Sequence, residues 1–182
     1  KGMKGAYIEF AREFNIWRGL AGHIEYDGGL TTGHRSEYGS QFQHALLVGP
    51  AWNFASKDYR RTLSVQAMYK QYFEGQNDKA YPSFQLTGVW HVDFGRNDMF
   101  TFNGFVDLWR DRRASDGKIR LTVCSEPQLW FNLDKVEGVS GTGLSFGTEV
   151  ELSNNFIVPA KGNRTFFCNP TLAIKWTMAN PF

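Results

Sequence analysis

The chain lacks any long apolar run, and this absence excludes a transmembrane helix. No uninterrupted stretch of about 18 apolar residues occurs in the sequence, whereas a helix needs about 20 to cross a bilayer. No segment of useful length repeats its apolar residues every 3.6 positions, so we expect almost no helix of any kind. The length of 182 residues fits a single domain that covers positions 1–182.

Cysteine and proline are scarce, and neither sign of charge dominates. The two cysteines, Cys124 and Cys168, are too few for a disulfide framework, and we expect free, partly buried thiols. The net charge is only +2, and no basic patch is interleaved with aromatic residues, which argues against a nucleic-acid partner. No catalytic signature stands out, so we predict neither an enzyme nor a bound cofactor or metal.

Aromatic residues and strict alternation are what the sequence has in abundance. Phe, Tyr and Trp make up 16% of the chain, which is more than a soluble core of this size usually carries. In nine segments the apolar and polar residues alternate with a period of two, the pattern of strands whose faces meet different environments. These segments span 6–14, 20–27, 42–54, 63–73, 84–94, 100–109, 120–131, 144–152 and 166–182.

This pattern favours an all-β fold, a transmembrane antiparallel up-and-down β-barrel. Half of each strand then faces a polar lumen, so the average hydropathy conceals the span. Short periplasmic turns and longer extracellular loops are typical of such barrels. The shorter connections are 17–19, 57–61, 95–98 and 134–142. The longer ones are 28–40, 74–83, 110–118 and 154–165.

The last segment keeps an apolar face up to the terminal residue, Phe182. Its members are Phe166, Cys168, Pro170, Leu172, Ile174, Trp176 and Met178, with Asn180 as the one polar exception. A closing strand that ends on an aromatic residue resembles the last strand of outer-membrane barrels, which the assembly machinery reads. If this end is periplasmic, nine strands put Lys1 outside, although bacterial barrels have an even number of strands and start in the periplasm. We therefore expect that an odd number of N-terminal strands is missing from this sequence.

Four runs of the chain carry a resemblance to a known family. They are KGMKGAYIEFAREFNIW at 1–17, HIEYDGG at 23–29, GTEVELSNNF at 147–156 and the end at 176–182. In these runs the chain resembles a Bacteroidota family of outer-membrane barrels that carries a domain-of-unknown-function label and is distantly similar to Tsx-type nucleoside-specific channels. The resemblance implies a pore or transport function. It also implies about three further strands, and thus about twelve in the intact protein, an even number.

The polar phase of the strands supplies the candidate solute path. His23 and Glu25 share one face, as do His91 and Asp93, and imidazole beside carboxylate can bind a metal or act as a base. Neighbours on one face lie about 6.6 Å apart along the strand, which suits a loose hydrogen-bond network inside a barrel better than a tight pair. The candidates are Tyr7, Glu9, His23, Glu25, Lys70, Tyr72, His91, Asp93, Asp107, Trp109, Arg120, Glu126 and Glu149.

The side chains on the polar and the apolar phase of the predicted strands each indicate a possible function. On the polar phase, rings beside carboxylates and amides fit a nucleoside or a sugar, although they can also simply fill the interior. Acidic residues outnumber basic ones there, so an open lumen favours cations or neutral solutes, whereas opposed charges can also plug a small barrel. On the apolar phase, aromatic residues gather near both strand ends, as in membrane girdles.

We therefore expect a protein of the bacterial outer membrane that contacts lipid and passes small polar solutes such as nucleosides. The alternative is a plugged accessory or structural subunit of a larger outer-membrane complex. A hydrolase built into the barrel wall and a soluble lipocalin-like binder are the remaining hypotheses.

Overall fold

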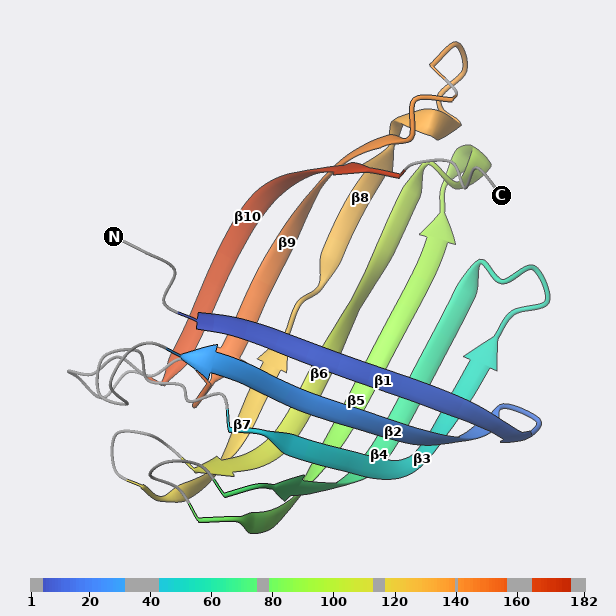
Figure 1. The fold of residues 1–182 in the computed structure, drawn as a ribbon. Helices are drawn as coiled ribbons and strands as arrows, with labels where there is room; N and C mark the ends of the chain where they lie inside the picture. Colours follow the sequence, from blue (N-terminus) through green and yellow to red (C-terminus); the bar gives the residue numbers. More distant parts are fainter. Residues whose placement is uncertain are drawn as a thin grey trace.

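The protein is built on one antiparallel β-sheet of ten strands (Figure 1). The computed structural model describes residues 5–31, 43–74, 79–112, 117–139, 141–156 and 165–177. Two short 3-10 turns, Arg96–Asp98 and Leu133–Lys135, are the only helical segments in these ranges. Within the same ranges, no helix is long and apolar enough to span a membrane. The strands are β1 (Gly5–Trp17), β2 (Leu20–Thr31), β3 (Ala45–Ala55), β4 (Arg61–Tyr72), β5 (Tyr81–Phe94), β6 (Phe100–Arg112), β7 (Ile119–Ser125), β8 (Gln128–Asn132), β9 (Leu144–Asn154) and β10 (Phe166–Trp176).

Each strand pairs with its neighbours in chain order, and β7 and β8 share one row of the sheet. Both pair with β6 on one side and β9 on the other. The register with β6 does not shift between them, since Asp107 lies opposite Cys124 and Asn103 lies opposite Gln128. The predicted segment 120–131 is thus one row interrupted once. The nine predicted segments correspond to the nine rows of the sheet.

The interruption between β7 and β8 has a local cause. Pro127 has no N–H to donate to a neighbouring strand. Opposite it, Gly104 adopts a φ of +155°, and a side chain there would come within 3.0 Å of the Pro127 Cα atom. Backbone bonds flank the break, since Glu126 donates to Phe105 (3.1 Å) and Val150 donates to Pro127 (3.0 Å). The break therefore needs a glycine opposite the proline.

The two faces of the sheet differ sharply, as the alternation predicts. The face that we call the inner face is the buried one. It carries His23, Leu47, Lys70, Gln85, Trp109, Thr122 and Ser153, together with the residues in phase with them. Many of its buried residues are polar or charged. On the opposite face, the outer face, the side chains are apolar and largely exposed.

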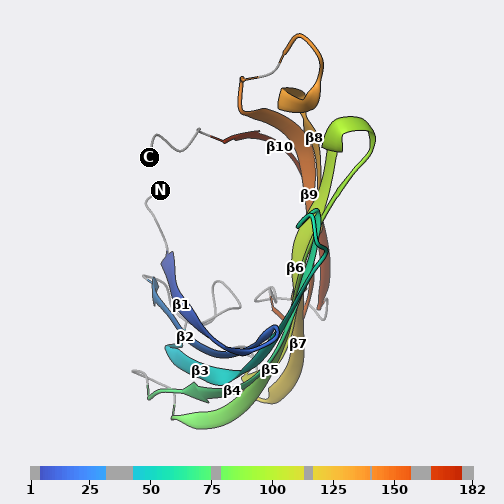
Figure 2. The same ribbon diagram turned by 90° about the vertical axis from the view of Figure 1, so that its right-hand side faces the viewer.

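The sheet is strongly curved toward its inner face (Figure 2). Side chains on strands that are not neighbours meet there: Asn53 on β3 donates to Glu13 on β1 (2.8 Å), and Lys70 on β4 donates to Asp27 on β2 (2.8 Å). Such contacts require the strands between them to bend inward. In the described part of the chain, β1 pairs with β2 and β10 with β9, so these two strands form the edges of the sheet.

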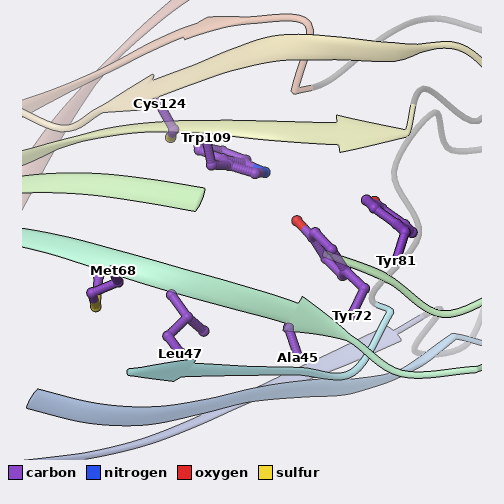
Figure 3. Close-up of a cluster of buried hydrophobic side chains, with 7 residues drawn as sticks. All are labelled: Ala45, Leu47, Met68, Tyr72, Tyr81, Trp109 and Cys124. Carbon is purple, nitrogen blue, oxygen red and sulfur yellow. The ribbon is translucent and has the colours of Figure 1, made fainter. Parts of the chain in front are cut away.

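An apolar cluster fills the inner face near the end of the sheet where β4 ends and β5 begins (Figure 3). Its members are Ala45, Leu47, Met68, Tyr72, Tyr81, Trp109 and Cys124, with Phe105 and Phe156 packed against them. They come from β3, β4, β5, β6 and β7, so the cluster ties five strands together through side chains as well as backbone bonds.

Two details differ from the sequence predictions, and one predicted feature lies outside the described residues. Strands β2 and β5 extend into the segments 28–40 and 74–83 that were predicted as loops, because backbone pairing continues past the alternating core of each strand. Both cysteines are free, as predicted, but Cys168 is exposed rather than partly buried because it points to the outer face; Cys124 is buried. The terminal residues 178–182, including Phe182, lie outside the described residues.

Candidate functional site

A chain of polar contacts centred on Lys70 crosses the inner face. The Lys70 Nζ atom donates to Asp27 Oδ2 (2.8 Å) and to Gln85 Oε1 (2.9 Å). Gln85 Nε2 then donates to Thr87 Oγ1 (3.2 Å), which donates to Asp107 Oδ1 (2.5 Å). Four strands, β2, β4, β5 and β6, are connected in this way. Two predicted site residues, Lys70 and Asp107, are therefore joined, although they do not touch.

A second polar group surrounds Glu13 on the edge strand β1. Its carboxylate lies 3.4 Å from His23 Nδ1 on β2 and accepts hydrogen bonds from Asn53 Nδ2 on β3 (2.8 Å) and Gln66 Nε2 on β4 (3.4 Å). One side chain thus gathers donors from three further strands. These contacts tie the edge strand β1 to β2, β3 and β4 through side chains.

Both predicted imidazole–carboxylate pairs form direct contacts. His23 Nε2 lies 2.9 Å from Glu25 Oε2, and His91 Nε2 lies 3.0 Å from Asp93 Oδ2. The spacing was expected to suit a loose hydrogen-bond network better than a tight pair. These two pairs are closer than that expectation, because the side chains lean toward each other, and His23 also contacts Glu13 as part of a network. Asp93 also accepts a hydrogen bond from Thr101 (2.6 Å). Within the residues that the structure describes, no three His, Cys, Asp or Glu side chains are placed to hold a metal ion.

The aromatic residues of the inner face form a packed group rather than separate rings. Tyr72 stacks on Tyr81 with ring centroids 4.5 Å apart, and Trp109 meets Phe156 edge-on at 5.5 Å. The Lys70 Nζ atom lies over the rings of Tyr72 (5.3 Å) and Trp109 (5.8 Å). Tyr72 is 4% exposed and Trp109 is 7% exposed. These rings fill the interior near the cluster of Figure 3 and present no open stacking face there.

Asp111 fixes this aromatic group through hydrogen bonds. It accepts one from the Tyr81 hydroxyl (2.9 Å) and one from Trp109 Nε1 (3.3 Å). The Tyr81 hydroxyl in turn accepts from the Arg112 backbone N–H (3.1 Å). The polar ends of the rings are therefore paired, as buried aromatic residues require.

A third polar group lies on β8 and β9. Gln128 Nε2 donates to Glu149 Oε2 (2.7 Å), and Trp130 Nε1 donates to Gln128 Oε1 (3.0 Å). The Lys175 Nζ atom on β10 lies 4.6 Å from the centroid of the Trp130 ring. This group is separate from the one around Lys70.

The remaining predicted site residues lie at separate places in the sheet. Glu9 lies opposite Asp27 in the register and is exposed, and Arg120 lies opposite Asp111. Glu126 sits at the interruption between β7 and β8. Tyr7 belongs to β1, but its side chain lies outside what the structure describes.

Sequence reasoning missed several residues that hold these groups together. Gln85 and Gln66 are neutral amides on the predicted polar phase, so the phase alone could have selected them. Asp111 and Tyr81 lie in segments that were predicted as loops, and no sequence signal marked them. Glu13 lies on the polar phase of the first predicted strand, but its contacts with Asn53 on β3 and Gln66 on β4 depend on the curvature of the sheet.

Family membership follows from the extent of one match. Residues 1–178 match the model of the family described as Domain of unknown function (DUF5020). The chain belongs to this family. The DUF5020 match includes all ten strands and all three polar groups. No curated protein and no solved structure matches the chain. The predicted domain-of-unknown-function label is thus confirmed, while the bacterial group and the likeness to Tsx-type channels stay predictions.

Proposed function

We propose that this DUF5020 chain forms the wall of a β-barrel in the bacterial outer membrane and lets small polar solutes such as nucleosides pass. The observation that carries the proposal is the reversed distribution of polarity. Large apolar side chains on the outer face are exposed along β1 to β10, up to 93% for Leu172. The buried inner face holds His23, Glu25, Asp27 and Lys70 instead. A wall between lipid and a polar lumen needs this arrangement.

The size of the apolar face supports contact with lipid. Soluble monomers rarely expose contiguous apolar patches above a few hundred Å². Here the exposed residues follow the outer phase of strand after strand. Examples are Phe10, Phe14, Ile24, Val48, Leu63, Val65, Leu86, Phe102, Val106, Leu121, Leu129, Phe146, Leu172 and Ile174.

Aromatic residues at the strand ends support the same assignment. Trp17, Trp52, Phe54 and Phe94 are exposed on the side of the short turns. Phe73, Phe84 and Phe166 are exposed on the opposite side. Aromatic rings at two levels are expected where a barrel crosses the two headgroup zones.

The inner face supports passage of a polar solute along carboxylates, amides and hydroxyl groups. Glu126, Glu149 and Asp107 add to an excess of acid on this face. Such a lining favours neutral or cationic solutes over anions. The distant similarity to Tsx-type channels that we expect for this family makes a nucleoside the solute to test first.

One observation favours the second candidate, a plugged accessory subunit of a larger outer-membrane complex. Tyr72, Tyr81 and Trp109 are packed and buried on the inner face, where an open path would leave aromatic rings accessible. The Lys70 network also crosses several strands at this level.

Two measurements test the proposal. Folded protein in mild detergent is expected to migrate faster on a gel before boiling than after boiling, as membrane barrels do; the absence of this shift, together with failure to enter lipid vesicles, contradicts the membrane assignment. Planar bilayers then separate the two candidates. A channel gives conductance steps that added nucleoside reduces, whereas a plugged subunit gives none and copurifies with a larger partner.

A further inference from the structure

The indole ring of Trp130 lies across a glycine on the neighbouring strand. Trp130 on β8 is opposite Gly147 on β9. A Cβ atom at Gly147 would come within 2.5 Å of Trp130 Cε3 and 2.8 Å of Cδ2. The ring and the Leu129 backbone oxygen, at 2.4 Å, therefore occupy the space that a side chain at 147 would take. One ring face lies against Gly147, and Trp130 is buried, with 6% of its surface exposed.

A cation already occupies the inner side of this ring. The Lys175 Nζ atom lies 4.6 Å from the ring centroid, within the distance at which an ammonium group is attracted to an indole face. Lys175 extends from β10, the strand beyond Gly147. Ala173, the residue opposite Gly147 on β10, is small, so the lysine side chain can reach over it.

A carboxylate is held beside the ring by a shared partner. Gln128 accepts from Trp130 Nε1 (3.0 Å) and donates to Glu149 Oε2 (2.7 Å). Asn103 Nδ2 also donates to the Gln128 oxygen (3.3 Å), which fixes the amide further. The ring and the negative charge are thus fixed relative to each other. An aromatic face next to a carboxylate is what a solute ammonium group recognises.

We propose that Trp130, Gln128 and Glu149 form a binding site for the ammonium group of a small organic cation. Lys175 is the tethered occupant that the solute displaces. The inference rests on the proposed function, because it takes the inner face as the solute path. It narrows the solute class to organic ammonium compounds, for which neither the strand pattern nor the family match provides an assignment.

The test measures binding of tetramethylammonium to the full chain in detergent by calorimetry. Replacing the tethered cation with an uncharged side chain of similar length, Lys175→Met, removes the competitor. The expected result is binding about five- to thirty-fold tighter than in the unchanged protein, the range of a cation–π contact. Adding Trp130→Leu to Lys175→Met is expected to abolish that gain. The matched control is Trp176→Leu, which removes an indole from the outer face.

Two further measurements test whether the site recognises a positive charge. Glu149→Gln keeps the shape of the side chain, removes its charge, and is expected to weaken binding severalfold. Tert-butanol, an uncharged compound of similar size, is expected not to compete. Each variant is first checked for the gel shift of the folded protein. If Lys175→Met does not fold, Glu149→Gln and Trp130→Leu in the otherwise unchanged chain must each weaken binding.

The outcomes separate this inference from the proposed function. Equal affinity of Lys175→Met and the unchanged protein overturns the site, as does full affinity after loss of Trp130. Conductance without tetramethylammonium binding overturns only the ammonium site. Binding without any conductance overturns only the channel function.

Discussion

At the scale of single residues, the inner face is organised by charges that are buried together. The Lys70 ammonium group and the Asp27 carboxylate are 7% and 10% exposed and 2.8 Å apart. Burying two charges is tolerable only because they satisfy each other and Gln85 accepts a further bond. The same pairing explains how a buried lysine is tolerated on a face where acidic residues outnumber basic ones.

Removing one member of this pair is expected to be costly. Lys70→Met leaves the Asp27 carboxylate buried without its cation, which lowers the free energy of unfolding by about 3–5 kcal/mol. Denaturant titration of the folded protein in detergent measures this change. The double variant Lys70→Met with Asp27→Leu is expected to recover more than half of the loss. Lys57→Met, in an exposed turn, is the control and should change stability by less than about 0.5 kcal/mol. Equal effects of the two lysine variants contradict the buried pair.

At the scale of strands and turns, the distance to neighbouring atoms decides which glycines cannot be replaced by a larger residue. Gly147 makes room for the Trp130 ring, whereas a Cβ atom at Gly22 on β2 meets only the Ile16 Cδ1 atom at 3.8 Å. Both residues sit within strands, so their backbone conformations are comparable. The two positions therefore form a matched pair.

Gly147→Ala is expected to lower the free energy of unfolding by about 1–3 kcal/mol. The reason is that the added methyl group would lie 2.4 Å from the Leu129 backbone oxygen and 2.5 Å from the indole ring. Gly22→Ala is expected to change stability little, by about 0.5 kcal/mol or less. Denaturant titration compares the two variants. A tolerated Gly147→Ala would mean that the ring does not lie on this glycine.

The turn between β8 and β9 depends on one carboxylate. The backbone N–H of Gly143 donates to Asp134 Oδ1 (2.8 Å) and Thr142 Oγ1 donates to it (3.2 Å). The Gly143 hydrogen bond, followed by the Thr142 hydroxyl, lowers the pKa of Asp134 below its usual 3.8. A carboxyl group whose pKa is depressed on folding stabilises the turn above the pKa of the unfolded chain, about 3.9. That stabilisation is lost as the pH falls through the folded value.

The Gly143 amide resonance is therefore expected to keep its hydrogen-bonded chemical shift at pH 4 and to move only at a pH below the usual range of an aspartate. NMR titration of the folded protein follows this change. Asp134→Asn should abolish the pH dependence. Asp58, whose pKa is lowered first by the Ser56 hydroxyl in another exposed turn, should titrate independently and serves as an internal reference.

At the scale of the whole molecule, the exposed outer face is the surface on which the proposed membrane assignment can be tested. Val65 lies in the middle of β4 and is 41% exposed. In water, a lysine at such a site is nearly neutral. In the middle of a bilayer it destabilises the protein by about 2–4 kcal/mol.

We therefore expect Val65→Lys to reduce the stability or the yield of vesicle-inserted protein. Tyr59→Lys is the matched control, because Tyr59 is 74% exposed in a turn outside the strands. Chemical denaturation in lipid vesicles measures both variants. No cost for Val65→Lys in folded protein would argue that the outer face does not meet lipid.

Much of the architecture follows from local pattern. A period of two is a property of each strand by itself, so the buried phase of β2 and β4 and the exposed phase of β3 agree with prediction without any knowledge of pairing. Three contacts do not follow from it, because they join strands that are not adjacent: Lys70 with Asp27, and Glu13 with Asn53 and Gln66. Tyr81 was not assigned to a strand from the sequence for a related reason. Its place in β5 comes from pairing with Tyr72 rather than from alternation.

The sequence by itself determined the all-β class, the nine rows and the polarity of each face, because alternation of side chains is built into an extended chain. Only the tertiary structure decided which inner-face groups meet. Asp27 reaches Lys70 and Lys175 reaches Trp130 because register and curvature bring non-neighbouring strands together. The break at Pro127 is likewise visible as a proline in the sequence, but its glycine partner, Gly104, is chosen by the register of β6. Curvature and register arise from all rows at once, and no single strand contains them.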